Sequence, residues 1–261
     1  MKRLWMAAAF FIICDLSAAQ AAAPRCTVPA DFTRLDDALP ATAARLKHHQ
    51  KLTIVAFGSS STAGVGASSP LATYPSQMGQ RLAHRFPDAT ISVLNEGISG
   101  ESSIEMAARF DRDTVNLHPD LVIWQTGSND ILNQTDPALF EAATRAGVER
   151  LHAAGIDVMI MEPQYSPRIV ANPNYGAYMN IIEKVARDEG VPIVHRFEAM
   201  EYWLDSGAIS HAEMLSGDAL HMSDASYACL GALVAAEISK SVAPATTRLA
   251  GHTTSAGSLM R

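Results

Sequence analysis

A serine-rich turn is the first segment of this chain that carries residues suited to covalent catalysis. It runs Gly58-Ser59-Ser60-Ser61-Thr62-Ala63-Gly64 and follows an apolar run at residues 52–57. A Gly directly after a buried strand allows a tight turn, and a helix that begins there aims backbone N–H groups at one spot. The run lacks the Gly-Lys-Ser/Thr of a P-loop and the GxGxxG spacing of a dinucleotide site. Ser60 is therefore a candidate nucleophile held beside oxyanion donors.

Two further turns follow apolar runs and offer hydrogen-bond donors. Asn95-Glu96-Gly97-Ile98-Ser99-Gly100-Glu101 has two glycines three residues apart, a spacing that lets the backbone at Gly100 present its N–H outward. Thr126-Gly127-Ser128-Asn129-Asp130 places an amide side chain, Asn129, where it can donate into a cleft. Taken singly, either turn also fits ordinary turn chemistry.

The fourth motif is Asp218-Ala219-Leu220-His221-Met222-Ser223, just before a helical pattern. An Asp three residues before a His can orient the ring and stabilise its protonated form, although a helix cap or a surface His are the simpler alternatives. Together the motifs supply a nucleophile (Ser60), a general base (His221) and an orienting carboxylate (Asp218). The N–H of Ser60, the N–H of Gly100 and the side chain of Asn129 are the expected oxyanion hole. This set predicts a serine esterase.

Alternating apolar and amphipathic segments must position these residues. Short runs rich in Val and Ile, as in buried parallel strands, occupy residues 52–57, 91–94, 121–125, 156–161 and 191–194. Helical patterns occupy residues 31–50, 75–86, 103–111, 137–154, 175–189 and 223–239. This alternation predicts one α/β domain with a five-stranded parallel sheet, helices on both faces, and ligands at the carboxyl ends of the strands.

The order and spacing of the motifs resemble the SGNH hydrolases, the GDSL-type esterases and lipases. The four residues that name this family match Ser60, Gly100, Asn129 and His221, and Asp218 matches its Asp three residues before the His. The resemblance covers about residues 52–240. It implies a three-layer flavodoxin-like sandwich, hydrolysis of carboxylic esters, and neither a metal nor an organic cofactor.

The chain departs from this family in two places. Gly58-Ser59-Ser60 stands where the family has Gly-Asp-Ser, so Ser59 and Ser61 are alternative attackers. Met222 follows His221, where the family often has Pro.

The N-terminus predicts export. Residues 1–23 pass from Lys2 and Arg3 through a short apolar stretch, interrupted by Asp15, to an Ala-rich end, which is typical of a cleaved secretory signal rather than a membrane anchor. The expected hydrolase domain then spans residues 24–242, and residues 243–261 form an expected mobile tail. The formal net charge of -7, without a Lys/Arg cluster in the expected domain, argues against a nucleic-acid partner.

Two cysteines remain after the signal segment, Cys26 and Cys229. In an exported protein they suggest a disulfide, and the alternative is a reduced pair with Cys229 as a small apolar helix residue. The sequence leaves both open.

Other functions compete with the esterase. An ordinary α/β-hydrolase wants G-x-S-x-G, which does not occur in the chain. An acyltransferase acting on glycans would use the same triad, and a catalytically inactive carbohydrate-binding protein would use the same fold. The expected partner is a small-molecule or glycan ester.

Overall fold

A computed structural model describes residues 26–29, 32 and 39–242 of the chain. One parallel sheet forms its centre, with the strand order β2-β1-β3-β4-β5. The strands are β1 (Leu52–Gly58), β2 (Ile91–Gly97), β3 (Leu121–Gln125), β4 (Asp157–Met161) and β5 (Ile193–Val194). All neighbouring pairs run parallel, so every strand ends at the same edge of the sheet. The predicted five-stranded parallel sheet is confirmed.

Side chains of successive strand residues pack on opposite faces of the sheet. In β1, Ile54 and Ala56 join one apolar cluster, whereas Val55 and Phe57 join the other. Because both faces are covered, nearly every residue of the central strands must be apolar, and this explains the continuous runs seen in the sequence. The result is a three-layer α/β sandwich, as expected.

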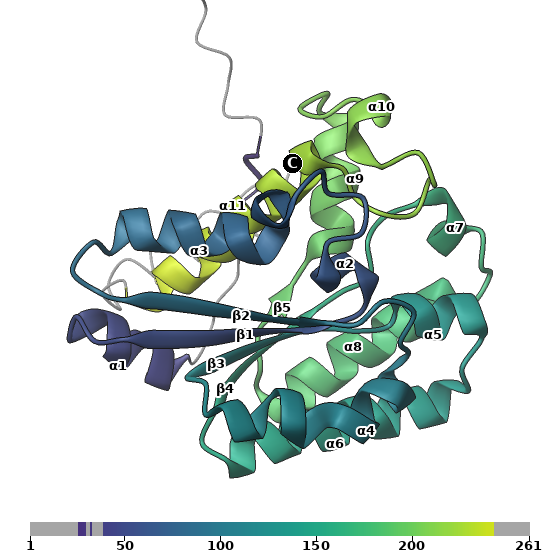
Figure 1. The fold of residues 1–261 in the computed structure, drawn as a ribbon. Coiled ribbons are helices and arrows are strands. Elements are labelled where there is room, and N and C mark those ends of the chain that lie inside the picture. Colours follow the sequence, from purple (N-terminus) through teal and green to yellow (C-terminus); the bar gives the residue numbers. More distant parts are fainter. Residues whose placement is uncertain (1–25, 30–31, 33–38, 243–261) are drawn as a thin grey trace, which may run out of the picture.

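The helices cover both faces of the sheet. They are α1 (Pro40–Lys47), α2 (Ser60–Ala63), α3 (Tyr74–Arg85), α4 (Ser103–Asp113), α5 (Ser128–Asn133), α6 (Pro137–Ala153), α7 (Pro167–Val170), α8 (Tyr175–Glu189), α9 (Arg196–Asp205), α10 (His211–Met214) and α11 (Asp224–Lys240). Between residues 39 and 242 the structure also has the 3-10 turns η2 (Pro70–Ala72) and η3 (Val115–Leu117). Figure 1 shows α3 and α11 on one side of the sheet and α4, α6 and α8 on the other.

The N-terminal helix is shorter than predicted. Helicity was expected over residues 31–50, but α1 begins at Pro40, and residues 33–38 lie outside the described part of the chain. Leu39 has non-helical backbone angles, because the ring of a following Pro disfavours the helical conformation in the residue before it. No helix is expected from the sequence between the fifth strand and residue 223, whereas the structure has two there, α9 and α10.

A disulfide joins Cys26 to Cys229 across 203 residues of sequence. It ties the segment that precedes α1 to α11. Of the two alternatives that the sequence left open, the linked pair is the one found.

The predicted signal segment and the predicted tail fall on residues 1–25 and 243–261, outside the described residues. Within the part that the structure describes, none of the helices has both the length and the apolar character for a membrane crossing.

Candidate active site

Ser60 lies at the start of α2, immediately beyond the end of β1. The turn is tight because two glycines make room for it. A Cβ on Gly58 would lie 2.4 Å from Thr62 Oγ1, and a Cβ on Gly97 would lie 2.1 Å from the backbone N of Ala63. A larger residue at Gly97 would displace the backbone of the helix that carries Ser60, and one at Gly58 would displace the side chains of Thr62 and Gln125. The sequence thus folds into a loop that holds this serine beside the ends of β1 and β2.

His221 connects the turn at Ser60 with Asp218. The His221 Nε2 atom lies 2.7 Å from Ser60 Oγ, and the other ring nitrogen, Nδ1, is hydrogen-bonded to Asp218 Oδ2. An antiparallel bridge between Leu215 and Met222 closes the loop that bears this pair. Ser60 and His221 are 161 positions apart in the sequence, yet with Asp218 they form one continuous series of contacts.

Several donors hold the Asp218 carboxylate in its charged form. Its Oδ1 accepts hydrogen bonds from Ser216 Oγ at 2.9 Å, from the Leu220 N–H at 3.0 Å and from the His221 N–H at 2.9 Å. Partial burial alone would raise the pKa of Asp218, but the hydrogen bond to the His221 ring and these three donors together lower it well below its usual range. The carboxylate is fixed in place and stays ionised.

The two neighbours of Ser60 are engaged elsewhere. Ser59 donates its N–H and its hydroxyl to Gln125 Oε1, each at 2.9 Å. Ser61 donates its hydroxyl to Gln164 Oε1 at 3.2 Å. Of the three consecutive serines, Ser60 is the one that contacts His221.

Asn129 and Gly100 belong to adjoining turns. Gly100 adopts a positive φ of 89°, the left-handed conformation that favours glycine, in the loop between β2 and α4. Asn129 lies in the first turn of α5, and its Nδ2 donates to the carbonyl of Glu101 at 2.8 Å. A side-chain amide has two N–H bonds, so this contact uses one of them. The structure thus brings the two residues expected to donate to an oxyanion to the same edge of the sheet.

Arg109 fastens the loops around Ser60, a role that the sequence did not indicate. This guanidinium from α4 is buried and donates to the carbonyls of Gly58 at 2.9 Å and Glu96 at 3.0 Å. It also pairs with Glu101 at 2.5 Å and with Asp113 at 2.9 Å. The ends of β1 and β2 and the loop bearing Gly100 are therefore joined through one side chain.

Gln164 is a second connecting residue that sequence reasoning missed. Its Oε1 accepts from Ser128 Oγ at 2.8 Å and from Arg196 Nη2 at 3.1 Å, in addition to Ser61. Its Nε2 donates to the carbonyl of Leu220 at 3.3 Å. Each of the three loops that carry Ser60, Asn129 and His221 thus makes a contact with this buried amide. The sequence shows only a polar residue shortly after an apolar run, two positions beyond Glu162, and this has little meaning without the fold.

Comparison with known proteins identifies the family of the chain. Residues 25–244 match the non-GDSL lipase-like family. An arylesterase of Vibrio mimicus is 25% identical over 173 residues, which cover 64% of this chain and 79% of that protein.

Solved structures share the fold. A two-domain esterase active on acetylated mannans superposes with a TM-score of 0.64 at 24% identity, over 76% of this chain and 52% of that one. Axe2, an acetylxylan esterase from Geobacillus stearothermophilus, superposes with a TM-score of 0.60 at 21% identity, over 72% of this chain and 94% of that one.

The family match and the arylesterase relative identify the chain as a carboxylic ester hydrolase of the SGNH type. The chain belongs to the non-GDSL lipase-like family, whose match extends over most of its length.

Proposed function

We propose that this chain is an exported serine esterase that hydrolyses acyl or acetyl esters through Ser60, His221 and Asp218. The observation that carries the proposal is the contact series from Ser60 Oγ to His221 Nε2, at 2.7 Å, and from His221 Nδ1 to Asp218. A nucleophile within hydrogen-bond reach of a base, with that base oriented by a third group, is the arrangement that acyl transfer needs.

In the first half of the reaction, Ser60 Oγ attacks the ester carbonyl while His221 Nε2 takes the hydroxyl proton. The C–O π bond becomes an oxyanion, and the ring becomes an imidazolium beside the ionised Asp218. Collapse of the tetrahedral intermediate breaks the bond to the alcohol, and His221 returns the proton to that leaving oxygen. The product is an acyl group on Ser60.

The oxyanion is assigned to the backbone N–H of Ser60, the backbone N–H of Gly100 and the second N–H of the Asn129 amide. Donors that are already fixed stabilise the developing charge without reorganisation. The contacts of Asn129 with Glu101, and of Arg109 with Gly58 and Glu101, support such fixed geometry.

In the second half, water replaces the alcohol. His221 removes a proton from this water, the hydroxide oxygen attacks the acyl carbonyl, and Ser60 leaves with the proton that the ring returns. The carboxylic acid is released and the site is restored. An acyltransferase would substitute a sugar hydroxyl for the water at this step.

We assign two classes of substrate: the acetyl esters of acetylated oligosaccharides, and simple aryl esters. The structural relatives act on acetylated mannans and xylan, and the sequence relative is an arylesterase. Export is assigned from the signal-like residues 1–23, and the Cys26–Cys229 disulfide supports it, since disulfides persist in oxidising compartments.

The test is labelling of the purified protein with a fluorophosphonate, alongside hydrolysis of nitrophenyl acetate and acetylated mannan and xylan oligosaccharides. Wild type and a matched control, Ser206→Ala, are expected to react and to turn over an ester, whereas Ser60→Ala does neither. An unlabelled wild type, as for a carbohydrate-binding protein, or a Ser60→Ala variant that keeps its label, would overturn the proposal.

A further inference from the structure

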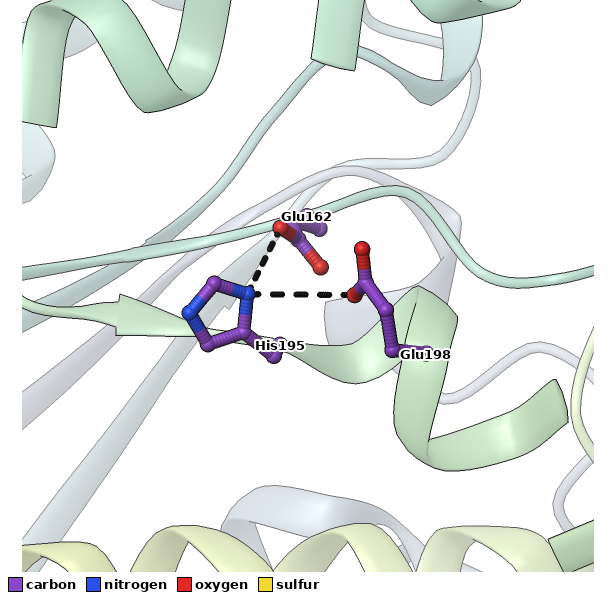
Figure 2. Close-up of side chains that lie close together, drawn as sticks. All are labelled: Glu162, His195 and Glu198. Carbon is purple, nitrogen blue, oxygen red and sulfur yellow. Dashed lines mark hydrogen bonds and ion pairs between the residues drawn. The ribbon is translucent and has the colours of Figure 1, made fainter. Parts of the chain in front are cut away.

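A second group of ionisable residues lies where β4 and β5 end. Glu162 directly follows β4, His195 directly follows β5, and Glu198 lies in the first turn of α9. Figure 2 shows both carboxylates directed at the same ring nitrogen of His195. One ligand atom from each of the three residues lies within 4.8 Å of the others.

The distances suit a metal ion. His195 Nδ1 lies 3.1 Å from Glu162 Oε1 and 3.8 Å from Glu198 Oε2. Bonds of about 2.0–2.2 Å to a tetrahedral Zn²⁺ place neighbouring ligand atoms about 3.4 Å apart. The two observed separations lie on either side of this value, so small side-chain movements bring all three atoms to one ion.

Glu162 is the residue that points to a missing partner. Its side chain is buried, and its second oxygen, Oε2, accepts no hydrogen bond. The neighbouring Arg196 donates to the main-chain carbonyl of Glu162 and to the side chain of Gln164, and not to the carboxylate. A buried carboxylate oxygen without a donor is costly unless a cation or a proton satisfies it.

We propose that Glu162, His195 and Glu198 form a binding site for a divalent transition-metal ion of the Zn²⁺ type. One imidazole and two carboxylates are ligands that Zn²⁺ accepts, and three protein ligands leave a coordination position for water. The side chains of His195 and Glu198 are 28% and 35% exposed, whereas the Glu198 Oε2 atom and the Glu162 side chain are buried, so the site lies just beneath the surface.

Such an ion would hold the end of β4 to the start of α9. It stands apart from the ester chemistry, which as proposed above uses no metal, and the inference does not rest on that function. Arg196 and Gln164 connect the region with the loops that carry Ser61, Ser128 and Leu220. Metal binding is therefore expected to stabilise the fold rather than to take part in bond cleavage.

The experiment is calorimetric titration of Zn²⁺ into the full, chelator-treated protein, with thermal unfolding measured in parallel. One ion is expected per chain, with a rise in Tm of several degrees at saturating Zn²⁺, since a ligand that binds only the folded state stabilises it. Glu198→Gln and His195→Gln are each expected to weaken binding at least tenfold and to reduce the rise in Tm at the same Zn²⁺ concentration.

Two control variants locate the ion. His152→Ala removes an exposed histidine, and His221→Ala removes the other histidine paired with a carboxylate; both are expected to bind Zn²⁺ like wild type. X-ray absorption of the loaded protein is expected to show nitrogen and oxygen ligands at about 2.0–2.2 Å and no sulfur. Circular dichroism checks that each variant is folded. Folded Glu198→Gln and His195→Gln proteins that bind as wild type does, a wild type that binds nothing, or loss of binding in His221→Ala alone would each overturn the site.

Discussion

Gln125 Oε1 accepts hydrogen bonds from both the N–H and the hydroxyl of Ser59, each at 2.9 Å. Ser59 occupies the position where Gly-Asp-Ser proteins carry an aspartate, and this pairing turns its side chain into the core. The hydroxyl of the next residue, Ser60, then faces His221. A buried amide on β3 thus takes part in deciding which of three consecutive serines is presented to the base.

Substitution of the three consecutive serines distinguishes the nucleophile from its two hydrogen-bonded neighbours. Ser60→Ala is expected to lower kcat at least about a thousandfold, because the nucleophile is removed. Ser59→Ala and Ser61→Ala are expected to keep activity within about tenfold and to lose about 1 kcal/mol of stability each, for the lost hydrogen bonds. Steady-state kinetics and urea unfolding of all three variants provide the measurement. If Ser59→Ala were the inactive protein, the assignment of the nucleophile would be wrong.

Asn129→Ala tests the oxyanion hole. The amide is expected to act mainly on the charge that develops in the transition state, so kcat should fall by about 10²–10³-fold with little change in KM. Asn133→Ala, an exposed asparagine on the same helix, is the matched control and should behave like wild type. An unchanged kcat with a raised KM would make Asn129 a substrate-binding residue instead.

Asp218→Asn tests the orienting carboxylate. Because hydrogen bonds keep the pKa of Asp218 well below its usual range, it is ionised throughout the neutral region and stabilises the imidazolium that forms on His221. The amide removes this charge and favours the wrong tautomer, so kcat/KM near pH 7 should fall by about 10⁴-fold. Asp205→Asn, an exposed aspartate, serves as the control. Near-full activity of Asp218→Asn would leave a Ser60–His221 dyad as the working site.

The disulfide is expected to contribute to stability. A crosslink between residues separated by 203 positions restricts the unfolded chain. In the chain-entropy description, this restriction raises the free energy of unfolding by at most about 5 kcal/mol. The double variant Cys26→Ala/Cys229→Ala should unfold at a clearly lower Tm, and reduced wild type should match it. An unfolded, non-reduced wild type that titrates two thiols would show that the link does not form in the cell.

Glu237 on α11 predicts a pH dependence of stability. Its carboxylate is buried, neither oxygen has a hydrogen-bond partner, and burial raises its pKa well above the ordinary value. The folded state therefore retains a proton that the unfolded chain releases above about pH 4.3. The free energy of unfolding accordingly falls as the pH rises from about 4.3 toward the raised pKa that Glu237 has in the folded state. Glu237→Gln should raise Tm more at pH 8 than at pH 4. The exposed Glu149→Gln should show no such trend, and a parallel shift in both variants would contradict the prediction.

The sequence by itself determined the strands, most of the helices and the order of the motifs. Each of these is a local property: a buried parallel strand must be apolar throughout, and Asp136 followed by Pro137 starts a helix, as the hydrogen bond from the Ala138 N–H to Asp136 shows. Gly58 likewise marks a turn, because a Cβ there would meet the side chain of Thr62, four residues further on. Such constraints act between near neighbours, so the pattern of residues reveals them.

Only the tertiary structure decided which distant side chains meet. Nothing in the pattern links Gln164 with Ser61, Ser128 and Leu220, because these contacts span 36 to 103 positions and depend on how the loops stack. The same holds for Glu162 beside His195, 33 positions away, whereas His195 and Glu198 lie three residues apart, one turn along the chain. The pairing of Cys26 with Cys229 was decided there too, since long-range geometry alone sets how far apart two side chains lie.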